Sequence, residues 1–81
     1  MVDETQGAIT DWDIRARTLL KVEMTKRNLT YKQLQAQLAE IGVVENEPTI
    51  RNKIGRGKFS VAFLLQCLKA MGVRHLDLSG M

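Results

Sequence analysis

The sequence of 81 residues has one cysteine, one histidine and one proline, and only 5% of its residues are aromatic. The single cysteine, Cys67, excludes an internal disulfide and is typical of proteins in a reducing compartment. No apolar run approaches the roughly 18 residues of a membrane span. The first ten residues lack the basic and apolar regions of a signal peptide. We therefore expect a soluble, cytoplasmic protein of one domain, with an aliphatic core.

Residues suited to catalysis or metal binding are equally scarce. His75 stands near the C-terminus, whereas Cys67 falls on an apolar stripe, where a thiol usually behaves as a small hydrophobic group. The two do not form a nucleophile–base pair, and no Cys, His or carboxylate cluster has metal-ligand spacing. The segment "GRGK" lacks the preceding strand and the length of a phosphate-binding loop. The sequence predicts no enzyme, no catalytic residue, no cofactor and no metal.

Acidic residues are nearly absent from the C-terminal part of the chain. Through Glu47 there are six Lys/Arg against eight Asp/Glu, a balance of −2, whereas from Pro48 onward there are six against one, a balance of +5. Such an asymmetry favours a polyanionic partner, although cations on a solvated face also serve solubility alone.

Apolar residues recur at helical spacing in four segments, which predicts an all-α fold. The first helix is expected from Asp11, with Thr10 and Asp13 as a capping box and Asn28 as its stop. Its predicted apolar stripe comprises Trp12, Ala16, Leu19, Leu20 and Met24.

The second helix is expected to follow the capping box of Thr30 and Gln33 and to stop at Gly42. Its predicted buried residues are Leu34, Leu38 and Ile41. The third is expected to begin near Pro48, with Glu45 and Glu47 at its positive end, to turn Ile50 and Ile54 inward, and to end at Gly55 and Gly57.

A fourth helix is expected between the cap Ser60 and the stop Gly72. Its predicted apolar stripe comprises Phe63, Leu64, Cys67, Leu68 and Met71. The final segment "VRHLDLSGM" has room for one short helical turn through Leu76 and Leu78.

The third helix is the strongest candidate for a binding site. With Ile50 and Ile54 inward, a rotation of about 100° per residue turns Asn52 and Arg56 outward, and Pro48 and Thr49 fall on the same side. Arg51 and Lys53 stand on its flanks, and Lys58 follows it. Asn and Arg side chains bond base edges, and Lys neutralises phosphates, so this face suits nucleic acid. A solvated helix with an excess of cations is the plainer alternative.

The start of the second helix adds a possible phosphate contact. Its first turn holds Tyr31, Lys32 and Gln33 with no acidic residue, and the N–H groups of a helix N-terminus attract anions. A helix end that is capped and binds no phosphate would have the same sequence pattern. The feature supports nucleic-acid binding mainly because the basic helix follows it in the chain.

The segments "LTYKQLQAQLAEIG", "PTIRNKIGRGKFS" and "VAFLLQCLKAMGV", followed by "LDL", resemble the Cro/lambda-repressor (XRE-like) helix-turn-helix family over about residues 12–78. Leu-Thr before the second helix, Arg-Gly after the third and Gly-Val after the fourth carry this resemblance. The residues in and around "RNKIGRGKFS" and "FLLQCL" also resemble those of a small bacterial family of such domains with no assigned function.

The resemblance implies a lambda-repressor-like bundle of four to five helices. From the helical pattern itself we expect this single domain to occupy residues 10–78, with a flexible tail over 1–9 and a frayed end over 79–81. The resemblance also implies that the third helix lies in the DNA major groove and that the second braces on the backbone. The implied DNA-binding residues are Thr49, Arg51, Asn52, Lys53, Arg56, Lys58, Tyr31, Lys32 and Gln33. The sequence departs from the family in two respects. The residue after Leu-Thr is Tyr31, and the connector between the second and third helices is about three residues longer than the usual tight turn.

We therefore expect a transcriptional regulator that binds double-stranded DNA as a homodimer in the cytoplasm, at the nucleoid when bound. The apolar "VRHLDL" tail or the first helix would provide the symmetric contact. The alternative is a protein–protein interaction module on the same fold, in which the acidic half and exposed apolar residues bind a partner protein. RNA is less favoured, because Tyr31 is the only exposed aromatic group expected to stack on bases.

Overall fold

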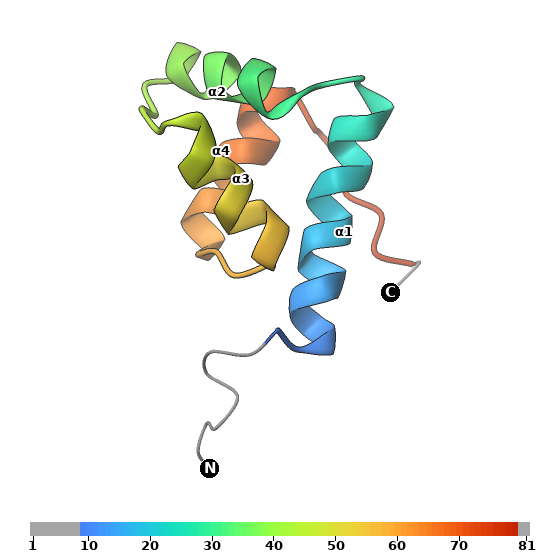
Figure 1. The fold of residues 1–81 in the computed structure, drawn as a ribbon. Helices are drawn as coiled ribbons and strands as arrows, with labels where there is room; N and C mark the ends of the chain where they lie inside the picture. Colours follow the sequence, from blue (N-terminus) through green and yellow to red (C-terminus); the bar gives the residue numbers. More distant parts are fainter. Residues whose placement is uncertain (1–8, 80–81) are drawn as a thin grey trace.

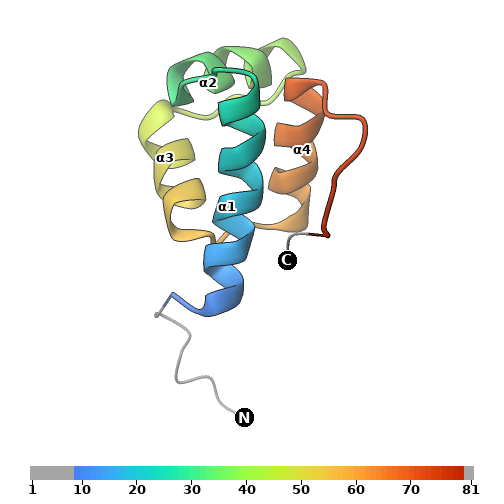
Figure 2. The same cartoon turned by 90° about the vertical axis from the view of Figure 1, so that its right-hand side faces the viewer.

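The computed structural model describes residues 9–79, which form four α-helices and no strand. The helices are α1 (Asp11–Lys26), α2 (Tyr31–Glu40), α3 (Glu47–Arg56) and α4 (Val61–Met71). Figures 1 and 2 show α2 crossing one end of the other three helices, with the C-terminal segment running back along the bundle from the end of α4. The all-α prediction is confirmed. Of the tail expected over residues 1–9 and the frayed end expected over 79–81, residues 1–8 and 80–81 lie outside the described residues.

Each of the four helices is preceded by an N-cap residue, whose side chain accepts a hydrogen bond from a backbone N–H in the first turn of the helix. The caps are Thr10, Thr30, Asn46 and Ser60, and each accepts from the third helical N–H. At Thr10 and Thr30 the capping box is complete. Three of the caps were predicted; Asn46 was not, and it places the start of α3 one residue before Pro48.

The core lies where the four helices meet. Its buried apolar residues are Leu20, Met24, Leu34, Leu38, Ile50, Ile54, Phe63, Cys67 and Met71. Every one of these residues was predicted to face inward. Because these side chains are the ones withdrawn from water among the described residues, this cluster supplies most of their apolar stabilisation.

The structure corrects four details of the prediction. Trp12 is 69% exposed, because α1 extends past the core at its N-terminal end, and Ile41 is 41% exposed at the C-cap of α2. Gly55 lies inside α3, which continues to Arg56 and ends at the left-handed Gly57. Residues 73–79 form no fifth helix; the left-handed Gly72 turns the chain out of α4 and the segment packs back instead.

Within residues 9–79, none of the helices combines the length and the apolar character that crossing a membrane requires.

Candidate nucleic-acid interface

The orientation of α3 is set by two isoleucines on its inner side. Ile50 and Ile54 are fully buried in the core, between α1 and α2. Asn52 and Arg56, on the opposite side of the helix, are exposed, and Thr49 is half-buried at its start. The outward face predicted from helical rotation is therefore present, and it carries amide, hydroxyl and guanidinium groups.

The C-terminal end of α3 is held against the first turns of α1. Gly57 is buried and has a φ of 67°, and a Cβ built on it would stand 1.8 Å from the carbonyl oxygen of Asp13. A guanidinium nitrogen of Arg17 donates to the carbonyl oxygen of Gly55 at 3.2 Å. The bond from Arg17 satisfies a carbonyl group that the end of α3 leaves without a helical partner. Together with the close approach of Gly57 to Asp13, it holds the end of α3 against α1.

Three of the four cations in this region face a carboxylate. Arg51 forms an ion pair with Glu47, one turn before it in α3. The ammonium of Lys53 lies 3.0 Å from a carboxylate oxygen of Glu45 in the connector. The linear sequence placed both glutamates at the positive end of α3 and did not suggest that they neutralise its cations. The four-residue spacing of the first pair is a signal that could have revealed it.

The third of these pairs lies beyond α3. The ammonium of Lys58 is 3.0 Å from a carboxylate oxygen of Asp13 in the first turn of α1. The pKa of Asp13 is lowered, first by the backbone N–H of Thr10 that donates to it, and then by Lys58. Lys58 therefore links the α3–α4 junction to α1, and the structure does not place it on the outward face of α3.

Arg51 also meets the first turn of α2. Its guanidinium lies over the ring of Tyr31, 5.5 Å from the ring centre, a geometry suited to a cation–π contact. Tyr31 and Lys32 share with Arg51 and Glu47 the rim of a shallow groove between α1, α2 and α3, and Lys21 lies on the α1 side. The structure thus brings two of the residues predicted on the second helix beside the start of the third.

The capping box limits what the first turn of α2 can offer a phosphate. The backbone N–H of Gln33 donates to Thr30 at 3.1 Å, and the Gln33 side-chain oxygen accepts from the backbone N–H of Thr30 at 2.8 Å. The groups left for an anion are the N–H groups of Tyr31 and Lys32 and the exposed Lys32 ammonium. Gln33 therefore acts first as part of the cap.

The remaining reactive groups lie away from this surface or are buried. Cys67 is buried in the core, and burial raises the pKa of its thiol to about 12, with smaller opposing effects of Lys53 and Glu45. His75 is exposed in the C-terminal segment. In the described part of the chain no three His, Cys, Asp or Glu side chains are grouped as metal ligands would be.

One family model matches the chain. It covers residues 12–76, hence nearly all of the four helices, and its description is a domain of unknown function (DUF6471). No curated protein and no solved structure is significantly similar to this chain.

Proposed function

We propose that this chain, which belongs to the DUF6471 family of domains of unknown function, binds double-stranded DNA through the outward face of α3. A lambda-repressor-like helix-turn-helix and a role as a cytoplasmic transcriptional regulator are part of the proposal. Within it, α3 enters the major groove and the first turn of α2 contacts the backbone.

The observation that supports this function best is the division of α3 into two faces. Ile50 and Ile54 fasten it to the core, and the exposed Asn52 and Arg56 stand opposite them. Among the described residues no carboxylate pairs with Arg56, which leaves a planar guanidinium free for a base edge or a phosphate. Asn52 is one turn away and suits the edge of an adenine.

The ion pairs on the flanks are compatible with DNA binding. An exposed pair such as Arg51–Glu47 contributes only about 0.3–0.5 kcal/mol when its residues are four apart in a helix. A DNA phosphate can therefore compete for Arg51 at small cost. The carboxylate of Glu47 then stands near the backbone and weakens binding, so the pairs would limit affinity for DNA of any sequence.

The connector defines how this helix pair differs from the usual motif. Six residues, 41–46, separate α2 from α3, where the tight turn of a helix-turn-helix has about three or four. Gln35 of α2 donates from its side chain to the carbonyl oxygen of Glu45 at 3.1 Å, which ties the longer connector to α2. We propose that this bond lets the pair dock as a unit.

Fluorescence anisotropy with labelled duplexes selected from a random pool tests the proposal. We expect binding that weakens linearly in the logarithm of salt concentration, with a slope of about −0.9 per phosphate contacted. Arg56→Ala should weaken binding about tenfold, because it removes from the outward face the cation that no carboxylate of the described residues pairs with.

Lys69→Ala is the matched control, since it removes one exposed cation from α4. It should have a much smaller effect. Absence of duplex binding at low salt, or equal losses in the two variants, would refute DNA binding through α3.

A second candidate is a protein-interaction module on the same fold. The observation that favours it is the pairing of Arg51, Lys53 and Lys58 with carboxylates, which leaves less free positive charge than the sequence indicated. Exposed apolar side chains, such as Val44 in the connector, would then contribute to the contact. The same titration separates the two functions, because this module would not bind duplex DNA at any salt concentration.

A further inference from the structure

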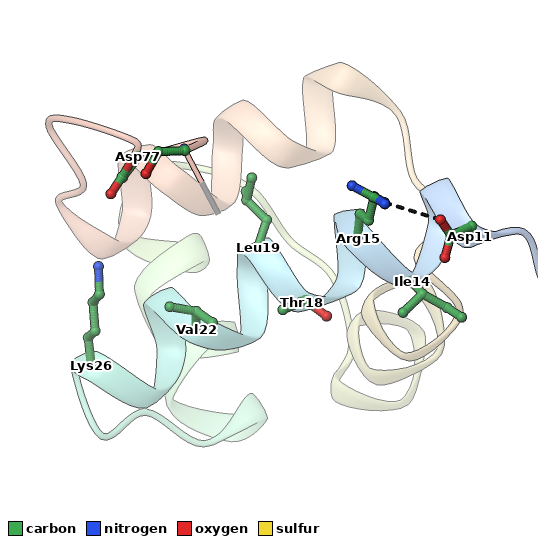
Figure 3. A pocket seen from close by; sticks show the side chains of 9 residues that line it. Asp11, Ile14, Arg15, Thr18, Leu19, Val22, Lys26 and Asp77 are labelled. Atoms are coloured by element: carbon green, nitrogen blue, oxygen red, sulfur yellow. Dashed lines mark hydrogen bonds and ion pairs between the residues drawn. The ribbon is translucent and has the colours of Figure 1, made fainter. Parts of the chain in front are cut away.

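The face of α1 opposite the core carries a groove that no described part of the chain covers. Figure 3 shows it between α1 and the C-terminal segment. Its volume is about 650 Å³, and it is lined by Asp11, Ile14, Arg15, Thr18, Leu19, Val22, Lys26, Asp77 and Ser79. The groove is larger than the one beside Tyr31, and it has a clear apolar centre.

Three side chains of the groove, two of them apolar, follow one line along α1. Ile14, Thr18 and Val22 are spaced by four residues, so they stand above one another on the helix. Ile14 is 41% exposed and Val22 is 43% exposed, and Leu78, between the lining residues Asp77 and Ser79 in the sequence, is 54% exposed. Thr18, between them, lies near the middle of α1 and is small enough to permit close approach of another helix.

The charges of the groove stand at its two ends. Asp11 and Arg15 lie at the end formed by the first turns of α1, where they form an ion pair of 3.2 Å. Lys26 and Asp77 lie at the other end, as Figure 3 shows. Each end thus holds one acidic and one basic group, and the acidic group of α1 is at its start while the basic group is at its end.

This pattern is complementary to itself under a two-fold rotation. If two α1 helices pack antiparallel with the axis beside Thr18, the Asp11 end of each copy meets the Lys26 end of the other. Ile14 then faces Val22 of the second copy, and Asp11 faces Lys26. The opposed helix dipoles also favour the antiparallel arrangement.

We propose that the groove along α1 is the surface on which a second copy of this chain docks, as a two-fold symmetric dimer. The same patch serves both copies, as in most homodimers, so the interface is closed and does not propagate. The apolar centre supplies the affinity, and the charged ends fix the antiparallel direction. The inference is independent of DNA binding, and the outward face of α3 is not part of the contact.

Sedimentation equilibrium of the whole chain over a concentration series tests the proposal. We expect a monomer–dimer equilibrium for the unaltered chain. Thr18→Arg places two like charges at the axis and should raise the dimer dissociation constant by about tenfold or more. Ala39→Arg is the control, because it adds the same charge to an exposed position on α2 and should leave the constant unchanged.

A pair of charge reversals tests the direction of packing. In Asp11→Lys alone, and in Lys26→Glu alone, both ends of the homodimer bring like charges together, so each variant should dissociate. Mixed in equal amounts, the two variants restore an attractive pair at both ends, and a dimer containing one copy of each should form. Circular dichroism of each variant verifies that α1 remains folded.

A loss of dimer through misfolding would not be reversed on mixing. An unaltered chain that stays monomeric throughout would overturn the proposal, as would a dimer that tolerates Thr18→Arg or variants that do not associate when mixed. A variant that does not dimerise can still be tested for DNA binding through α3, with a duplex that holds a single half-site. The two proposals can therefore fail separately.

Discussion

Among single residues, Gly57 determines how closely α3 approaches α1. Its φ of 67° favours glycine, and the Asp13 carbonyl lies where a side chain would begin. Both requirements meet at one position because the C-cap of α3 is also its contact with α1. The glycine of the Arg-Gly pair in the sequence therefore has a structural reason that is separate from any role in binding.

Gly57→Ala should destabilise the fold by about 3 kcal/mol or more, because it combines left-handed strain with a backbone clash. Gly42→Ala is the control, since Gly42 has a φ of 83° but nothing within 4 Å of an added Cβ. It should cost only about 1–2 kcal/mol. Urea denaturation of both variants gives the comparison, and equal losses would contradict the close approach of Gly57 to Asp13.

Cys67 is a core residue whose chemistry is suppressed by burial. Its thiol is fully buried, and the folded pKa of about 12 exceeds the ordinary value of 9.0. The raised pKa favours the neutral thiol in the folded state. As pH rises from 9.0 toward 12 the unfolded chain loses this proton first, so the thiol makes the fold less stable over that interval.

We expect a thiol reagent such as dithionitrobenzoate to react with Cys67 at the rate of global or local opening at pH 8. In denaturant the same thiol should react at the rate of a free cysteine. Cys67→Ala should flatten the fall of stability in the alkaline interval, relative to the unaltered chain. Rapid labelling of the folded protein would show that the core is open at this point.

At the scale of the element, the residues that end a helix also set the direction of the segment that follows. All four helices end with a residue at positive φ, and three of these residues, namely Asn28, Gly42 and Gly72, share one hydrogen-bond pattern. In each case the next backbone N–H donates to the carbonyl five residues earlier: Leu29 to Met24, Val43 to Leu38 and Val73 to Leu68. Each such end turns an apolar residue back onto the core, so the stop signal also directs the next segment.

Arg27 joins two of these ends. Its guanidinium lies 2.7 Å from a carboxylate oxygen of Glu23 and donates to the carbonyl oxygen of Met71 at 3.1 Å. Glu23 is buried, and Arg27 is its better-shielded partner. The pair therefore connects the end of α1 to the end of α4.

Arg27→Ala should lower the free energy of unfolding by about 2–3 kcal/mol, because it leaves the Glu23 carboxylate and the Met71 carbonyl without this donor. Lys26→Ala removes the other cation beside Glu23, 3.5 Å away, but its side chain is well exposed. It should cost less than about 1 kcal/mol. Thermal denaturation distinguishes the two, and similar losses would contradict a buried role for the Arg27 pair.

At the scale of the whole molecule, folding redistributes the charge asymmetry of the sequence. Glu45, Glu47 and Asp13 all belong to the acidic part of the chain, yet each pairs with a cation of the basic part. The surface around α3 is therefore less positive than the sequence suggests. Among the described residues around α3, Arg56 on α3, Lys32 on α2 and Lys21 on α1 have no carboxylate partner.

If α3 binds DNA, Glu47→Gln should strengthen binding about two- to tenfold at low salt, because it frees Arg51 and removes a negative charge beside the phosphates. Glu40→Gln makes the same change of charge at an exposed position in the last turn of α2 and should have a smaller effect. Anisotropy titrations of both variants against one duplex measure the difference. Weaker binding of Glu47→Gln would indicate that Glu47 orients Arg51 for contact.

Most of the fold could be predicted because its signals are local. The caps Thr10, Thr30 and Ser60 and the inward stripe of each helix depend on residues within one or two turns. Trp12 and Ile41 were misplaced because helical spacing gives the side of a helix and not how far the core extends along it. Asn46 was overlooked because Pro48 was the more obvious start.

The sequence by itself determined four helices with three of their caps, the residues that fill the core and the outward direction of Asn52 and Arg56, since each follows from local pattern and helical geometry. Only the tertiary structure decided which cations remain free, how Gly57 meets α1, and that the rear of α1 forms a groove with the C-terminal segment. Those features join residues that are distant in the chain, as with Lys58 and Asp13. Helical periodicity says nothing about such meetings, because they depend on how the helices pack.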